Sequence, residues 1–229
     1  MNTVLAVVGL AREARIARRA GLAPVIGAGN STLLARRLRA ASAEVKAVVS
    51  FGIAGSLAPL PQVGDVIIGT HVVTEREHFA CDPEWSRILR TRLPDAISAV
   101  IAGVEAPAGH MGAKKALFRE TGAHVVDMES HIAARFAAQR GLPFVVLRAI
   151  SDGADRTLPP AALERLSWSG KPRLFAIFKS LVREPGQFAE LLRTGREAGA
   201  AFRALLRCLD VLGPGLGCPY LGEPGFDVP

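Results

Sequence analysis

The chain is poor in cysteine and in aromatic side chains, and both shortages exclude classes of protein. Its three cysteines, Cys81, Cys208 and Cys218, lack the spacing of metal ligands. We therefore expect no metal site, reduced thiols and a cytoplasmic setting. Aromatic residues make up only 6% of the chain although the formal net charge is +7. A nucleic-acid-binding surface usually combines clustered cations with aromatic residues, so no nucleic-acid partner is expected.

Long uncharged apolar runs are also missing. No window of the 229 residues reaches the length of a membrane-spanning helix without a charge. The apolar run at the N-terminus is short and follows no basic region, which indicates a first buried strand and not a signal peptide. The many arginines are spread along helix-like segments. Solvated helix faces explain such spacing, and attraction to an anionic membrane surface or to phosphate is the alternative.

What the chain does contain is a series of short apolar runs that alternate with helical patterns. Continuous apolar runs are typical of parallel strands buried on both faces. The predicted strands are Thr3–Val8, Ala23–Ile26, Val45–Phe51, Asp65–Val73, Ala123–Met128 and Pro143–Ile150, and the predicted helices are Arg12–Ala20, Ser31–Ala43 and Ser130–Arg140. The alternation predicts an α/β sheet with helices on both faces.

The pattern changes beyond Asp155. A short helix is expected at Ala161–Leu166, and apolar residues recur at helical spacing between Pro185 and Leu212. The tail after Gly213 is rich in glycine and proline and predicts no regular structure. We interpret residues 1–180 as one domain and residues 181–229 as a helix and an irregular tail packed on it.

Glycine or polar residues follow four of the predicted strands, at the edge where open α/β sheets bind ligands. These candidate site residues are Gly9 and Glu13, then Gly52, Ile53, Ala54 and Gly55, then Asp127, Met128 and Glu129, and finally Ser151 and Asp152. The glycine turn lacks the lysine of a phosphate-binding loop and the glycine spacing of a dinucleotide-binding loop. ATP hydrolysis and hydride transfer are therefore disfavoured.

The acidic residues have a catalytic and a structural interpretation. A desolvated carboxyl group at Asp152 would be able to donate a proton near neutral pH. Alternatively, Ser151 or Asp152 could cap the turn after the strand, and Glu129 could face the N-terminus of a helix. The glycines could likewise serve only a tight turn.

Several segments resemble a known family. "VVDMES", "LPFVVLRAISDGAD" and "SFGIAGSLAP" resemble the signature and the glycine turn of the purine nucleoside phosphorylase and methylthioadenosine nucleosidase superfamily. "GLAREARIA", "KKALFRETGAHVVDMESHIAARFA" and "LPPAAL" are similar to a branch associated with hopanoid biosynthesis, which removes adenine from adenosylhopane. The resemblance implies a three-layer α-β-α sandwich with a mixed, largely parallel central sheet and a helical C-terminal appendage.

The resemblance also implies roles for single residues. Glu129 would bind the ribose 2′-hydroxyl, Met128 would pack against the sugar, and Asp152 would protonate or hydrogen-bond N7 of the leaving adenine. An acid near the base relieves the negative charge of the leaving group, and an anionic environment near the ribose tolerates its positive charge. Asp127, Ser151 and the glycine turn complete the expected substrate-binding set. The implied substrate is an adenine nucleoside with a hydrophobic 5′ group, cleaved by a homo-oligomer without a cofactor. The basic C-terminal helix, which carries Arg193, Arg196, Arg203 and Arg207, packs on its own domain or on a partner subunit, and peripheral contact with a membrane is the alternative.

The chain departs from the nucleosidases at several positions. Ala14 aligns with their water-activating glutamate, and one position on a helix turns a side chain by roughly 100°, so the replacement of that acid by Glu13 stays open. Ile53 stands where nucleosidases have a serine. Arg12 could bind phosphate, so both hydrolysis and phosphorolysis with inorganic phosphate as co-substrate remain possible reactions. A non-catalytic nucleoside- or lipid-binding protein is the alternative function.

A second basic segment lies where the base-side loop of the family passes. It contains His110, Lys114 and Lys115. Nothing in the local pattern distinguishes these residues from a solvated loop, and a solvated loop is the prediction.

Overall fold

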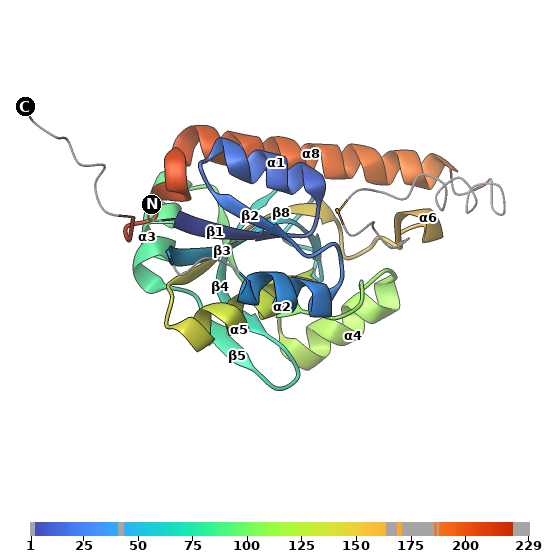
Figure 1. Ribbon diagram of the computed structural model, residues 1–229. Coiled ribbons are helices and arrows are strands. Elements are labelled where there is room, and N and C mark those ends of the chain that lie inside the picture. Colours follow the sequence, from blue (N-terminus) through green and yellow to red (C-terminus); the bar gives the residue numbers. More distant parts are fainter. Residues whose placement is uncertain (1–2, 41–43, 164–168, 171–185, 187, 222–229) are drawn as a thin grey trace, which may run out of the picture.

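The computed structural model describes residues 3–40, 44–163, 169–170, 186 and 188–221 (Figure 1). The strands are β1 (Thr3–Val8), β2 (Ala23–Ile26), β3 (Val45–Ser56), β4 (Val66–Val73), β5 (His78–Ala80), β6 (Ile97–Gly103), β7 (Val125–Asp127) and β8 (Phe144–Asp152). The helices are α1 (Ala11–Arg19), α2 (Ser31–Arg39), α3 (Pro83–Arg92), α4 (Met111–Thr121), α5 (Ser130–Arg140), α6 (Pro160–Leu163), α8 (Phe188–Leu212) and the 3-10 turn η2 (Pro214–Gly217).

The strands form one mixed sheet. β2, β1 and β3 pair in parallel, and β3 continues in parallel to β8 along most of its length. β8 pairs antiparallel with β4, β4 pairs in parallel with β6, and β6 pairs in parallel with β7. β7 returns to the far end of β3 through the antiparallel pairs Gly55–Val126 and Ser56–Val125. Strands β3, β8, β4, β6 and β7 therefore form a closed ring, and β2 and β5 lie at the two ends of the sheet.

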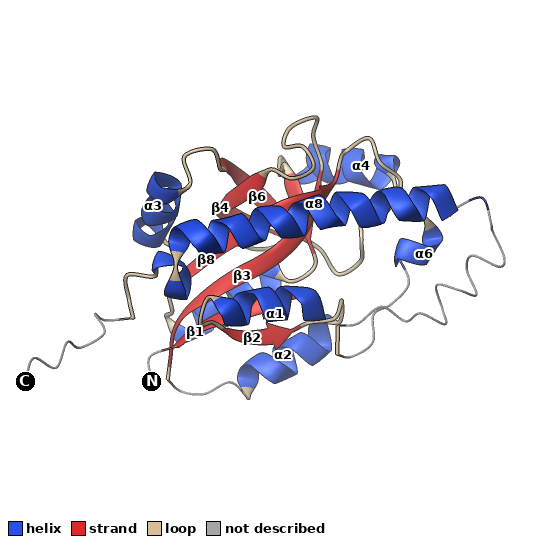
Figure 2. Ribbon diagram, turned by 90° about the horizontal axis from the view of Figure 1, so that it is seen from above, coloured by secondary structure: helices blue, strands red, loops and turns tan. Residues whose placement is uncertain are grey.

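Helices cover both faces of the sheet (Figures 1 and 2). On one face α1, α3 and α8 enclose an apolar core that includes Ile16, Trp85, Phe202 and Leu205. On the other face α2 and α5 enclose a second core that includes Leu34 and other aliphatic side chains. The layers are helices, sheet and helices, as predicted from the sequence.

Local signals fix the helix ends that frame the site. The Asn30 side chain accepts a hydrogen bond from the Leu33 N–H at 2.8 Å and begins α2, as expected of an N-cap asparagine. Gly141 ends α5 with a backbone φ of +61°, a conformation that glycine adopts without strain. α3 carries an equally clear start signal, because Asp82 caps it and Pro83 is its first residue. The sequence reading nevertheless missed α3, together with α4, β5 and β6.

The C-terminal segment packs on the domain. The described part of the long helix begins at Phe188, and the expected start at Pro185 lies outside the described residues, as does the end of the short helix predicted at Ala161–Leu166. The described tail just after α8 is irregular, as predicted, because Gly215 and Leu216 have positive backbone φ angles of 67° and 54°. Pro214–Gly217 form a 3-10 turn in which Leu216 is buried and its carbonyl oxygen accepts a hydrogen bond from Trp85 Nε1 at 3.0 Å. Within the described residues, no helix has both the length and the apolar character needed to cross a bilayer.

Candidate active site

A cavity of about 210 Å³ opens where the carboxyl ends of β1, β3, β7 and β8 meet. Glu129 and Asp152 both line this cavity, so the two acids at the ends of different strands face a common space. The other lining residues are Gly9, Leu10, Glu13, Gly29, Ile53, Ala54, Gly55, Val104, Pro107, Ala108, Val126, Asp127, Met128, Ser151 and Leu158. Of the predicted site residues, only Gly52 does not line it.

Glu13 points inward from the first turn of α1 and is only 1% exposed. Its Oε2 accepts hydrogen bonds from the N–H groups of Gly9 at 2.8 Å and Leu10 at 2.7 Å, and its Oε1 accepts one from Ile53 at 2.8 Å. These bonds turn the side chain into the cavity, which answers the geometric question raised by Ala14. Burial raises the pKa of Glu13, against the lowering influence of Arg148 and of the three backbone donors.

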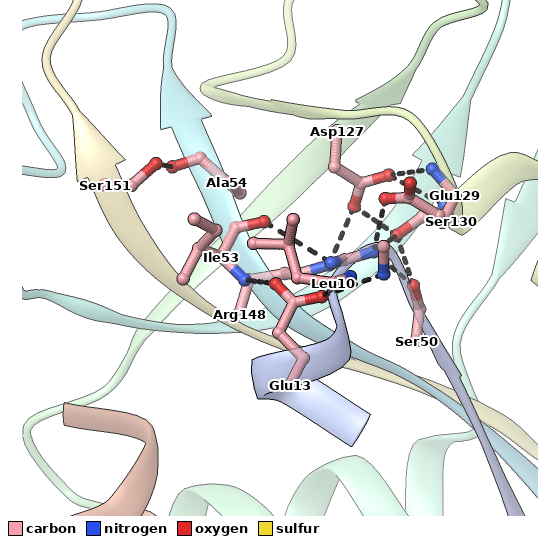
Figure 3. A network of polar contacts seen from close by, with 11 residues as sticks. Leu10, Glu13, Ser50, Ile53, Ala54, Asp127, Glu129, Ser130, Arg148 and Ser151 are labelled. Carbon is pink, nitrogen blue, oxygen red and sulfur yellow. Dashed lines mark hydrogen bonds and ion pairs between the residues drawn. The ribbon is translucent and has the colours of Figure 1, made fainter. Parts of the chain in front are cut away.

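Arg148 is a fully buried cation at the centre of the polar network (Figure 3). It lies on β8, and its Nε is 2.9 Å from Asp127 Oδ2. Its Nη2 donates to Ser50 Oγ at 2.7 Å and lies 3.8 Å from Glu129 Oε2. No local pattern indicates this role, because Arg148 is embedded in an apolar strand and its partners come from β3, β7 and α5.

Asp127 is occupied by protein donors. Its Oδ1 accepts the N–H groups of Glu129 at 3.0 Å and Ser130 at 2.7 Å, and its Oδ2 contacts the Ser130 hydroxyl as well as Arg148. The side chain is 2% exposed. Asp127 therefore fixes the start of α5 and the guanidinium of Arg148, and the substrate-binding role that the resemblance implies for it stays a prediction.

Glu129 is the N-cap residue of α5, and its side chain makes no capping hydrogen bond there. The residue lies at the N-terminus of a helix, as the structural interpretation expected, and its side chain also lines the cavity. Burial raises the pKa of Glu129 to about 8, with further upward contributions from the nearby acids Asp127 and Glu13 and a lowering contribution from Arg148. Glu13, Asp127 and Glu129 thus lie around the single guanidinium of Arg148.

Glycines make room for these carboxyl groups. A Cβ on Gly52, whose φ is +150°, would lie 2.3 Å from Glu13 Oε1 and 2.8 Å from Arg148 Nη1. A Cβ on Gly9 would lie 2.8 Å from Glu129 Oε1, and one on Gly55 would lie 2.9 Å from Asp152 Oδ2. Real Cβ atoms do not approach other atoms so closely in a packed interior. These glycines therefore leave space for the carboxyl groups of the site, in addition to allowing the turn of the backbone.

Asp152 is the last residue of β8, and a turn follows it at the edge of the cavity. The Ser151 hydroxyl donates to Asp152 Oδ1 at 2.8 Å and to the Ala54 carbonyl oxygen at 3.2 Å. Lys114 Nζ lies 2.5 Å from Asp152 Oδ2. The prediction of a solvated loop was wrong here. His110 caps α4, its Nδ1 accepting the Ala113 N–H at 3.1 Å, and Lys114 in the first turn is 1% exposed.

The lining of the cavity is acidic. Four carboxyl groups face it, and no lysine or arginine is among the described residues that line it. Arg12, the candidate phosphate ligand, is exposed and stacks on Phe202, with 4.3 Å between its guanidinium carbon and the ring centre. Among the residues that the structure describes, no group of His, Cys, Asp and Glu side chains is arranged to hold a metal ion.

Comparisons with known proteins agree with this architecture. Residues 4–183 match the family model described as the phosphorylase superfamily. No curated protein matches the sequence. A Helicobacter pylori methylthioadenosine nucleosidase with 5′-methylthioadenosine in its active site is similar in structure, with a TM-score of 0.63 and 16% identity over 92% of this chain and 99% of the other.

Two further solved structures have the same fold. The futalosine hydrolase of Helicobacter pylori gives a TM-score of 0.60 at 17% identity, covering 92% of this chain and 98% of that one. A 5′-methylthioadenosine/S-adenosylhomocysteine nucleosidase from Neisseria meningitidis in complex with methylthio-immucillin-A gives 0.56 at 18% identity, covering 90% and 99%.

Proposed function

The chain belongs to the phosphorylase superfamily, and from this membership and the geometry of the cavity we propose that it hydrolyses the N-glycosidic bond of a purine nucleoside and releases adenine. The observation that carries the proposal is the placement of Glu129 and Asp152 on one cavity, which Glu13 also lines. Solved structures of similar fold hold 5′-methylthioadenosine or an adenine nucleoside analogue, which supports the same substrate class.

Asp152 acts at the leaving base. When the bond between C1′ and N9 breaks, its electron pair passes to the purine. A proton taken up from solvent and passed through Asp152 to N7 lets the base leave as neutral adenine, and the proton that Glu13 removes from the attacking water returns to solvent. Asp152 Oδ1 and Oδ2 each have one described protein donor, so lone pairs remain to share that proton. Stabilisation of the charge that develops on the leaving group is the kind of electrostatic contribution that dominates many enzymes.

Glu129 and Met128 act at the sugar. Glu129 hydrogen-bonds the ribose 2′-hydroxyl, a contact that strengthens when an oxocarbenium-like charge develops on the ring. Its pKa of about 8 means that it carries a proton in the empty site. Positive charge on the sugar polarises this hydrogen bond, so Glu129 binds the transition state more strongly than the ground state.

Glu13 activates water. The water oxygen forms the new bond to C1′, and Glu13 accepts a proton from this water as general base. Hydrolysis is favoured over phosphorolysis because inorganic phosphate would enter a cavity lined by four carboxyl groups and by no cation among the described lining residues. No cofactor enters this scheme.

The cavity suits a nucleoside whose 5′ group extends out of it. A volume of about 210 Å³ is below the several hundred Å³ of pockets that enclose larger ligands, roughly 300–1,000 Å³. Leu10 and Ile53 give the site apolar walls. We favour adenosylhopane, the substrate implied by the hopanoid-associated segments, with its hydrocarbon group outside the cavity.

A lipid substrate requires access to a membrane surface. Helices α1 and α8 lie side by side (Figure 2), and Arg15, Arg18, Arg203 and Arg207 are exposed on them. Such a face attracts anionic lipid headgroups. The double variant Arg203→Glu/Arg207→Glu is expected to reduce flotation with anionic liposomes, and equal flotation of both proteins would remove this part of the proposal.

A homo-oligomer also belongs to the proposal. A groove of about 1,120 Å³ lies next to the site and shares Val104 with it. The groove includes residues 73–78 and Glu105, and a second subunit seated there would close the site from the side. Light scattering on the purified protein tests this assembly directly.

The decisive experiment is product analysis. The purified protein is incubated with adenosine and with adenosylhopane, with and without phosphate, and adenine and the sugar product are quantified. Hydrolysis predicts adenine and a free ribosyl product at a rate independent of phosphate. Formation of a ribosyl phosphate would indicate phosphorolysis instead of hydrolysis. Tight binding of the nucleoside without turnover would indicate a nucleoside-binding protein.

A further inference from the structure

Lys114 differs from its neighbour Lys115 although both lie in the first half of α4. Lys115 is exposed, whereas Lys114 is 1% exposed. Lys114 Nζ donates to Asp152 Oδ2 at 2.5 Å and to the Gly153 carbonyl oxygen at 2.7 Å. Burial of an ammonium group is costly unless an anion pairs with it, so Asp152 is its counter-ion.

Lys114 lies behind Asp152 as seen from the cavity. Asp152 lines the cavity and Lys114 does not. The Ser151 hydroxyl holds the other oxygen of the same carboxylate, Oδ1, at 2.8 Å. The two donors fix the carboxylate in one orientation, and its remaining lone pairs are available to a bound base.

A carboxylate in this position distinguishes between purines. A 6-aminopurine protonated at N7 presents two adjacent N–H groups, one on N7 and one on the 6-amino nitrogen, and a carboxylate accepts both. A 6-oxopurine presents a carbonyl oxygen in place of the amino group, so oxygen lone pairs face the carboxylate. A site built for a hydrogen bond strongly rejects an analogue that cannot make it.

We propose that Lys114 determines the choice of leaving base, because it holds Asp152 as an oriented carboxylate and thereby selects 6-aminopurines over 6-oxopurines. The inference rests on the proposed function, since it concerns the leaving group of that reaction. Lys114 is a positioning residue that acts through Asp152. Without its ammonium, Asp152 loses its counter-ion and the donor that orients Oδ2, and the discrimination against a 6-oxo group weakens.

The test compares adenosine with inosine. Values of kcat/KM for the two nucleosides are measured for the wild type, Lys114→Met, Lys114→Arg and the matched control Lys115→Met. The ratio of the two values does not depend on the fraction of folded enzyme. Lys114→Met is expected to lower the adenosine-to-inosine ratio by about ten-fold or more, the effect of one lost charged hydrogen-bond arrangement. Lys115→Met should leave the ratio within about two-fold, and Lys114→Arg should restore most of it.

Two outcomes would overturn the proposal. The first is a wild type without preference for adenosine, and the second is a Lys114→Met ratio equal to that of the wild type, because a purely structural ion pair lowers both rates alike. If Lys114→Met does not fold, Lys114→Gln supplies a donor without the charge and is expected to lower the ratio as well. Calorimetric binding of adenine and hypoxanthine needs no turnover. A preference for adenine that depends on Lys114 would support the role of this residue even if neither nucleoside were cleaved. The binding experiment therefore tests the inference about Lys114 separately from the proposed function.

Discussion

The free energy of unfolding of the Glu129→Gln variant, taken relative to that of the wild type, should increase as the pH rises. Burial raises the pKa of Glu129 from 4.5 to about 8. The folded protein therefore holds this proton more tightly than the unfolded chain does. The corresponding contribution to stability is fully present below about pH 4.5 and is lost as the pH rises through about 8.

The size of the effect follows from the two pKa values. Their difference is 8 − 4.5 = 3.5 pH units, and at about 1.4 kcal/mol per unit the full loss is about 5 kcal/mol. Between pH 5 and pH 8 the wild type should lose about 3 to 4 kcal/mol through this residue alone. Glutamine has nearly the same shape and does not titrate, so Glu129→Gln removes the dependence.

The assay is urea unfolding at several pH values and constant ionic strength. The quantity of interest is the free energy of unfolding of Glu129→Gln minus that of the wild type, because other titrating groups largely cancel in this difference. It should increase with pH, whereas Glu120→Gln, an exposed change on α4, should give a flat difference. A Glu129→Gln difference that stays constant or falls with pH would refute the assignment of a retained proton to this carboxyl group.

Three further substitutions test the site. Gly52→Ala places a Cβ 2.3 Å from Glu13 Oε1, so we expect adenine release to fall about 100-fold and stability by about 1–3 kcal/mol. Gly195→Ala, where a Cβ meets nothing within 4 Å, is the matched control and should lower neither the rate of adenine release nor the stability. Arg148→Met leaves Asp127 buried without its cation and should lower the free energy of unfolding by about 3–5 kcal/mol; an unchanged urea midpoint would contradict this. Glu13→Gln should reduce kcat about 10²- to 10⁴-fold while adenine binding in calorimetry stays intact, and rescue by phosphate would argue against hydrolysis.

The parts of the fold that the sequence predicted are those with a local cause. Continuous apolar runs gave β1, β3, β4 and β8, and the helical patterns gave the start of α2 and both ends of α5. Helix α4 could not be found in this way. Its only fully buried side chain is that of Lys114, so it has no apolar stripe for a periodicity to detect. β5 has three residues, too few for any pattern.

The residues of the candidate site likewise fall into those with a local signal in the sequence and those without one. The two acids at strand ends were visible, because a carboxyl group after a buried run is unusual and its sequence context resembles a known signature. Arg148 and Lys114 were not visible, because each is buried only through partners distant in sequence. Lys114 meets Asp152 across 38 positions, and Arg148 meets Ser50 across 98. Long-range pairing of this kind follows from the register of the sheet and cannot be deduced from neighbouring residues.

The closed ring of strands has a consequence for solubility. A strand at the margin of a sheet exposes unpaired backbone groups and can recruit a strand from another molecule, which begins aggregation. Here the margins are β2, with four residues, and β5, with three. Every longer strand is flanked on both sides, apart from register irregularities. Within the described residues, the architecture thus offers incoming chains only two short templates, which is a defence against intermolecular strand addition.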